Sequence, residues 1–186
     1  MTKRSMVRAA VALCGISGLA GCVSAPRPQP APAPTSAPAP LPPAPTSVSD
    51  NWRDWPVAPG GWSYRTTERG TIASFGQPGR ATLLSFRCDL ATHRIFVARA
   101  TSHPANRISG QMTVHTSFGE TQWPVTGTSM TGASGAYATA IRAGNDGTFD
   151  KIAFSRGRFA IEAPGAAPIA VPGWAEVSRV IEDCRG

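Results

Sequence analysis

Short runs in which apolar and polar side chains alternate fill most of residues 50–186, and glycine, proline, asparagine and aspartate stand between them. The runs cover residues 62–68, 71–76, 82–88, 94–100, 111–117, 121–127 and 136–142. Alternation with a period of two is typical of strands that bury one face. Short strands at this close spacing indicate an antiparallel β-sandwich or barrel-like domain rather than a βαβ fold. We therefore predict a mainly β fold.

A hairpin is predicted over 152–162, "IAFSRGRFAIE". With an Arg-Gly turn at 156–157, Phe154 would face Phe159 on one side of the ribbon, and the small or polar side chains would lie on the other. We expect this apolar face to rest on the core.

One α-helix is predicted after Pro172. The side chains that share a face at spacings of three and four are Trp174, Val177, Val180, Ile181 and Cys184. The charged residues between them fall on other faces, so the segment is amphipathic. We expect this C-terminal helix to pack on the sheet, with Cys184 close to its buried stripe.

Residues 1–21 have the layout of a secretory signal peptide. Three basic residues precede an apolar run from Ala9 to Leu19, and two small residues follow. The run is shorter than the roughly 20 apolar residues that a membrane-spanning helix needs. We predict that this segment is removed.

The stretch Leu19-Ala20-Gly21-Cys22 resembles the lipobox of bacterial lipoproteins. The resemblance implies cleavage before Cys22, lipidation of Cys22 and a membrane anchor of several acyl chains. Val23, where some lipoproteins have aspartate, implies the outer membrane of a Gram-negative bacterium, with the protein facing the periplasm. The alternative for the same segment is a plain secretory signal.

Residues 22–49 form a Pro/Ala-rich tract with one charged residue, Arg27. This composition is typical of a disordered linker with extended polyproline II character, which rises by about 3.1 Å per residue. We expect a spacer of at most roughly 80 Å between the anchor and a domain over 50–186. A recognition motif for a partner is the alternative.

The positive charge of the chain is mild once the signal is set aside. The formal charge of +7 includes Lys3, Arg4 and Arg8, which leaves +4 for the rest. Basic residues are not clustered on one element, so we predict no nucleic-acid partner. Arginines spread over 65–107 are expected to be solvated strand positions, with attraction to anionic lipid headgroups or glycans as the alternative.

Two cysteines remain after Cys14 leaves with the signal and Cys22 takes the anchor. In an oxidising periplasm, Cys88 and Cys184 are expected to form a disulfide. A loop of nearly a hundred residues would be closed, which the chain-entropy model values at roughly 4.7 kcal/mol. The alternatives are a nucleophilic Cys88 and a metal-binding pair.

Catalytic and metal-binding patterns are weak. His93, His103 and His115 have no metal-ligand spacing, and the segment "GNDGTFD" lacks the spacing and closing glutamate of a calcium loop, which favours a hairpin or Asx turn. We predict no cofactor, no metal and no enzymatic activity. A hydrolase would need the fold to gather two histidines or a Ser/His pair.

Aromatic side chains are concentrated at the start of the domain, where Trp52, Arg53, Trp55 and Trp62 lie close in sequence. Exposed tryptophans beside an arginine can stack on sugar rings or anchor a partner. They can equally fold back as a flap over a sheet edge, and we favour the flap.

The segments "RCDLATHRIFVARA" and "ASGAYATA" are similar to parts of membrane-bound inhibitors of chicken-type lysozyme. The resemblance implies a β-barrel, a disulfide near the C-terminus and an inhibitory loop at Ser134-Gly135. A predicted C-terminal helix, a longer chain and the lack of a basic-aromatic segment after the loop depart from that family.

These features together predict a membrane-anchored, non-catalytic binding or assembly module whose partner is an envelope protein or glycan. The alternatives are a lysozyme-inhibitor-like or carbohydrate-binding lipoprotein and an unrecognised periplasmic hydrolase.

Overall fold

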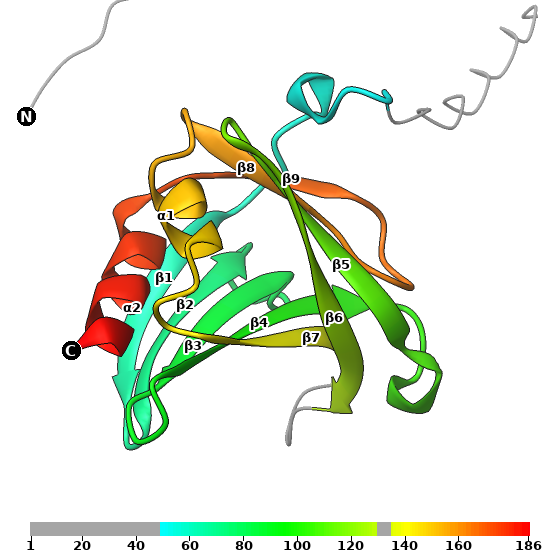
Figure 1. Ribbon diagram of the computed structural model, residues 1–186. Coiled ribbons are helices and arrows are strands. Elements are labelled where there is room, and N and C mark those ends of the chain that lie inside the picture. The colour runs from blue at the N-terminus through cyan, green and yellow to red at the C-terminus, as the bar shows by residue number, and fades with distance from the viewer. Residues whose placement is uncertain (1–48, 130–134) are drawn as a thin grey trace, which may run out of the picture. The chain divides into compact units, whose positions relative to one another are not determined.

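An antiparallel sheet of nine strands is the frame of the residues that the computed structural model describes, 49–129 and 135–186 (Figure 1). Its strands are β1 (Gly61–Thr67), β2 (Gly70–Gly76), β3 (Leu84–Asp89), β4 (Arg94–Thr101), β5 (Ser109–Thr116), β6 (Gly119–Ser129), β7 (Ala136–Ala143), β8 (Arg158–Glu162) and β9 (Ile169–Pro172). The helices are η1 (Trp52–Asp54), η2 (Ala105–Arg107), α1 (Thr148–Ala153) and α2 (Ala175–Arg185). The predicted signal segment 1–21, the lipidation site Cys22 and nearly all of the linker lie outside the described residues.

The strand order is β1-β2-β3-β4-β7-β6-β5-β8-β9. Three sets of consecutive strands, β1 to β4, β5 to β7 and β8 to β9, form simple antiparallel meanders. The meanders are joined by two pairings between strands distant in sequence, β4 with β7 and β5 with β8. The sequence pattern predicted most of these strands but not their order.

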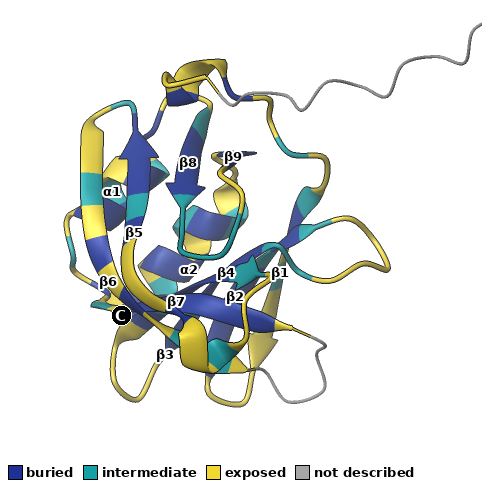
Figure 2. Ribbon diagram, turned by 90° about the vertical axis from the view of Figure 1, so that its right-hand side faces the viewer, coloured by how far each residue is buried: buried dark blue, intermediate teal, exposed yellow. Residues whose placement is uncertain are grey.

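The sheet coils until its two end strands approach each other. The indole N–H of Trp62 on β1 donates a hydrogen bond of 2.8 Å to the carbonyl oxygen of Pro172 on β9. Helices α1 and α2 contact each other beside the coiled sheet (Figure 1). In the view of Figure 2, α2 is seen among the strands. The mainly β, barrel-like fold with one C-terminal helix is thus confirmed.

Apolar side chains at alternate strand positions fill the inside of the coil. The largest fully buried side chains are Phe75, Leu84, Phe86, Ile95, Met112, Trp123, Phe159 and Ile161 on the strands, and Phe149, Ile152 and Ile181 on the two α-helices. Period-two alternation therefore separates an inner face in the core from an outer face, as predicted for strands buried on one side.

Helix α2 packs its predicted apolar stripe onto β1, β2 and β3. Val177, Val180, Ile181 and Cys184 are buried, but Trp174 precedes the helix and stays 47% exposed, so its predicted place in the stripe was wrong. The predicted disulfide between Cys88 and Cys184 is confirmed, with the two Cα atoms 5.4 Å apart. It ties α2 to β3.

The hairpin predicted over 152–162 is wrong in its first half. The Asp146 carboxylate accepts a hydrogen bond of 2.9 Å from the Thr148 amide, and this Asx turn leads into α1, whose buried residues include Ile152. Phe154 follows the helix and is exposed, whereas Phe159 is buried on β8. Strand β8 pairs instead with β5 and β9. A short amphipathic helix and a strand both bury apolar residues, so the local pattern could not separate them.

Candidate functional site

The aromatic segment at the start of the domain folds back on the sheet. Trp52 and Trp55 are 7% and 6% exposed and pack with Ala160 and Ala170 in a small second core. Val57 forms a parallel bridge to Ala170, which covers the edge of β9. We call this segment, residues 49–58, the flap. Its geometry is the one that the flap interpretation required.

The other residues considered for binding are also accounted for. Trp62 is buried in the main core against Phe75 and Phe86, so its indole face is not offered to a ligand. Arg53 is exposed, and its guanidinium carbon lies 5.0 Å from the centre of the Trp52 ring. Of this group, only Arg53 presents its charged end to solvent.

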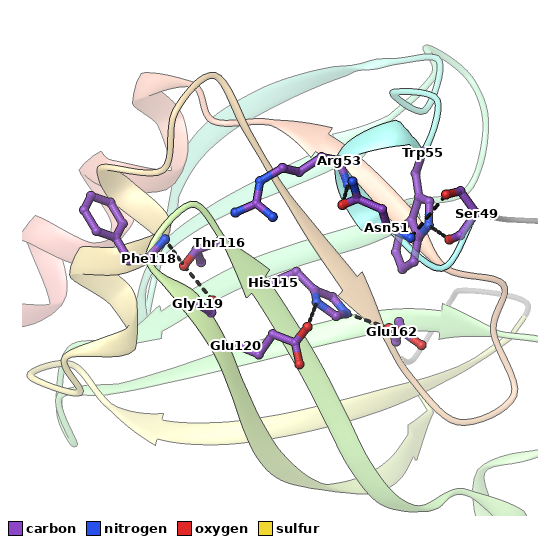
Figure 3. Close-up of polar contacts among 10 residues, drawn as sticks. All are labelled: Ser49, Asn51, Arg53, Trp55, His115, Thr116, Phe118, Gly119, Glu120 and Glu162. Atoms are coloured by element: carbon purple, nitrogen blue, oxygen red, sulfur yellow. Dashed lines mark hydrogen bonds and ion pairs between the residues drawn. The ribbon is translucent and has the colours of Figure 1, made fainter.

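His115 lies beneath the flap between two carboxylates (Figure 3). Its Nδ1 is 3.0 Å from the Glu120 carboxylate, and its Nε2 is 2.6 Å from that of Glu162. The Trp52 ring stacks on the imidazole at 6.1 Å, and the Trp55 ring meets it edge-on at 5.5 Å. A residue of the outer face of β5 is therefore buried by the flap.

The contacts of His115 join three strands. Glu120 is on β6 and Glu162 is on β8, so the two hydrogen bonds tie β5 to both of its neighbours in the sheet. The flap contacts the imidazole through the rings of Trp52 and Trp55. We call this arrangement the His115 clamp.

The three histidines occupy separate places. His93 places Nδ1 2.9 Å from the carbonyl oxygen of Cys184, next to the disulfide. His103 lies in the connection after β4, where its amide donates to the Thr101 hydroxyl. His115 is under the flap. The fold does not bring them together, as a hydrolytic or metal site built from two histidines would require.

The two aspartates of the "GNDGTFD" segment are engaged in ion pairs. The Asp146 carboxylate lies 2.7 Å from the Arg142 guanidinium, and Asp150 lies 2.7 Å from that of Arg185. Hydrogen bonds from Thr148 help to hold the pKa of Asp146 below its ordinary value, although burial alone would raise it. Within the described ranges, no cluster of three His, Cys, Asp or Glu side chains is arranged to hold a metal ion.

A groove of about 230 Å³ crosses the outer face of the sheet from β2 through β3, β4 and β7 to β6. We call it the outer groove. It is lined by Ile72, Ser85, Arg87, Phe96, Ala98, Thr128, Ser129 and Thr139. The strand register places Ser85, Ala98 and Thr139 in one cross-strand row, so small side chains form its floor.

One wall of the outer groove combines a cation with an aromatic ring. The guanidinium carbon of Arg87 lies 4.0 Å from the centre of the Phe96 ring, on the neighbouring strand. Burial lowers the pKa of Arg87, and the charge of Asp89, whose carboxylate lies 4.0 Å away, opposes that shift. The arginine is 35% exposed, so its remaining donors are available to a ligand.

Asp89 is the buried carboxylate at the end of this wall. The Thr92 hydroxyl donates to it at 3.0 Å and lowers its pKa, and the Arg69 guanidinium at 2.8 Å lowers it further. Asp89 therefore makes its short contacts with Arg69 and Thr92. Arg87 is farther from the Asp89 carboxylate, at 4.0 Å, so its charge is neutralised only in part.

Arg99 shows that not every arginine of the 65–107 group is a surface charge. It is 7% exposed and donates hydrogen bonds to the carbonyl oxygens of Leu83, Ala100 and Ala167. Burial lowers its pKa. This side chain fastens the β8–β9 connection to β3 and β4, and its role is structural.

The loop implied by the lysozyme-inhibitor resemblance is only partly visible. Ser134 lies outside the described residues, and Gly135 is exposed just before β7. No family model, no curated protein and no solved structure matches this chain. In the described part of the chain, no helix is long and apolar enough to cross a membrane.

Sequence reasoning identified the flap but missed the outer groove and the role of His115. Period-two alternation did place Ser85 and Arg87 on the opposite face of β3 from the core residue Phe86. The groove, however, depends on β4 lying beside β7, a neighbour that no local pattern specifies.

Proposed function

We propose that this protein is a lipid-anchored, non-catalytic binding module of a Gram-negative cell envelope. Cys22 holds it on the periplasmic side of the outer membrane, and a ligand is taken in the outer groove. The groove is the observation that carries the proposal, since it joins a partly exposed arginine, an aromatic ring and hydroxyl groups at one hollow. The Leu19–Cys22 pattern supports the anchor, and the disulfide supports an oxidising compartment.

The chemistry of the outer groove favours an envelope glycan that carries a carboxylate or phosphate. An arginine held over a ring, as Arg87 is over Phe96, is suited to a planar anionic group. The small floor residues leave room for a compact group, and the hydroxyls of Thr128 and Thr139, 2.6 Å apart, offer donors and acceptors to sugar hydroxyls. The separation of the three histidines supports binding over the hydrolase alternative.

The anchor is tested by the mass and membrane partition of the native protein beside a Cys22→Ala variant. We expect the native protein to carry acyl chains, to fractionate with outer membrane and to show no free thiol. A soluble, unacylated native protein would contradict the anchor without bearing on the groove.

The groove is tested by sedimentation with purified peptidoglycan, a periplasmic glycan rich in carboxylates. We expect Arg87→Ala to weaken binding about tenfold, the loss for one charge-assisted hydrogen bond. Arg179→Ala is the matched control, because Arg179 lies 4.2 Å over the ring of Tyr64, away from the groove, and should bind as the native protein does. Equal loss in both variants, or no sedimentation of the native protein, would contradict the proposal.

A further inference from the structure

Three large aromatic side chains are exposed on neighbouring connections of the fold. Phe118 lies between β5 and β6 and is 55% exposed, Phe154 lies between α1 and β8 and is 72% exposed, and Trp174 lies between β9 and α2 and is 47% exposed. We call these residues the aromatic end. Isolated exposed apolar residues are ordinary, but three exposed aromatic residues on connections that are hydrogen-bonded to one another call for an explanation.

Hydrogen bonds hold the three connections side by side. The Ser117 amide donates to the Ser155 hydroxyl at 3.0 Å, and the Arg156 amide donates to the Ser117 hydroxyl at 3.1 Å. The Gly173 amide donates to the Gly157 carbonyl oxygen at 3.1 Å. Each of these residues is next to, or within three positions of, an exposed aromatic residue. The aromatic end is therefore presented by a fixed scaffold.

The chain that leads back to Cys22 joins the domain next to the aromatic end. Arg158, the first residue of β8, donates at 3.0 Å to the carbonyl oxygen of Trp55 in the flap. The Trp55 indole N–H in turn donates to the carbonyl oxygen of Ser49, the first described residue. The flap and the turns that carry Phe118 and Phe154 lie at the same end in Figure 1.

The charges around the patch suit a lipid surface. Arg156 is exposed between Phe154 and β8, and the side chain of exposed Arg53 extends from η1 in the direction of the Phe118 turn (Figure 3). Tryptophan and phenylalanine beside arginine are the combination that proteins place in the headgroup layer of membranes with anionic lipids. The nearby Asp54 carboxylate is engaged by the Ser49 hydroxyl.

We propose that Phe118, Phe154 and Trp174 form a membrane-docking surface that enters the headgroup layer of the bilayer to which Cys22 is tethered. This inference rests on the proposed lipid anchor, because a tether confines the domain near the bilayer and lets a weak surface dock. Strand β6 runs from Gly119, beside Phe118, to Ser129 at the outer groove, a path of about 30 Å. Docking through the aromatic end would therefore keep the groove away from the lipid.

The experiment uses the full acylated chain in vesicles of phosphatidylethanolamine and phosphatidylglycerol whose acyl chains are brominated, a quencher of nearby indoles. The other four tryptophans are buried, so the difference between the native protein and Trp174→Phe isolates Trp174. We expect most of the Trp174 emission to be lost. Phe118→Ser with Phe154→Ser should restore it, whereas Ile141→Ser, an exposed apolar residue on the outer face of β7, should not.

The outcomes separate this proposal from the anchor. Vesicle-bound, acylated protein whose Trp174 is not quenched would overturn docking and leave the anchor standing. Unacylated native protein would overturn the anchor and docking together, because the docking surface is proposed for a tethered domain. Far-ultraviolet circular dichroism confirms that each surface variant is folded.

Discussion

The outer face of the sheet is treated in two different ways. Over β5, β8 and β9 it is covered by the flap, which buries Trp52 and Trp55 on His115. Over β2, β3, β4 and β7 no segment among residues 49–129 and 135–186 covers it, and the outer groove lies on this bare face. The tryptophan-rich segment, which suggests binding when met in sequence, completes the fold. The bare face carries Arg87, one of the arginines over 65–107 for which attraction to lipid headgroups or glycans was only the alternative.

The difference teaches that residue type is a weaker guide to a binding surface than what covers it. Tryptophan offers a large apolar area and is as useful for closing a sheet as for holding a ligand. Ser85 and Ala98 are small, and they matter here because small side chains on adjacent strands leave a hollow between larger ones.

The largest expected effect comes from removing the disulfide that ties α2 to β3. Replacing both cysteines, Cys88→Ser with Cys184→Ser, should lower the free energy of unfolding by about 4 kcal/mol, because the unfolded chain regains the freedom of a loop of nearly a hundred residues. Denaturant titration measures the loss, and reduced native protein is the comparison. A loss below about 1 kcal/mol would mean that α2 stays on β3 without the bridge.

A smaller effect tests the covered face. Trp52→Ala should lower the free energy of unfolding by about 3 kcal/mol, the lower end for a buried tryptophan, because the flap is a satellite of the main core. Trp174→Ala, which removes an exposed indole, is the matched control and should change stability by no more than about 0.5 kcal/mol. Equal changes in the two variants would refute a packing role for the flap.

The smallest effect tests the bare face through its acid dependence. The pKa of Asp89 is lowered in the folded state, so its contribution to stability is present at neutral pH and is lost as the pH falls through and below about 4. We expect Thr92→Val, which removes the hydroxyl that lowers this pKa most, to flatten the fall in unfolding free energy with acid. Arg69→Ala, which removes a charge and a hydrogen bond that also lower this pKa, should flatten it as well. If the unfolding free energy of both variants falls with acid as it does in the native protein, the ionisation of Asp89 does not contribute to stability.

Local pattern was sufficient for the features that depend on neighbours in sequence. Period-two alternation placed most strands, spacing of three and four placed Val177 to Cys184 on α2, and the cysteine count paired Cys88 with Cys184. It failed where two structures bury the same residues, as at Ile152 in α1, and where burial depends on the direction that the chain takes at the end of an element, as at Phe154 and Trp174. The groove and the His115 clamp require knowledge of which strands pair across the sheet.

The two long-range pairings of the sheet carry a consequence for folding. The outer groove crosses the junction of β4 with β7, and the His115 to Glu162 contact crosses the junction of β5 with β8. Pairings between strands 35 or more residues apart form late, because the entropy of loop closure must be overcome first. A chain that has made its hairpins but not these junctions has neither a groove nor a clamp. If the groove takes a ligand as proposed, capture is reserved for molecules that have completed their assembly, and binding itself becomes a reporter of maturation.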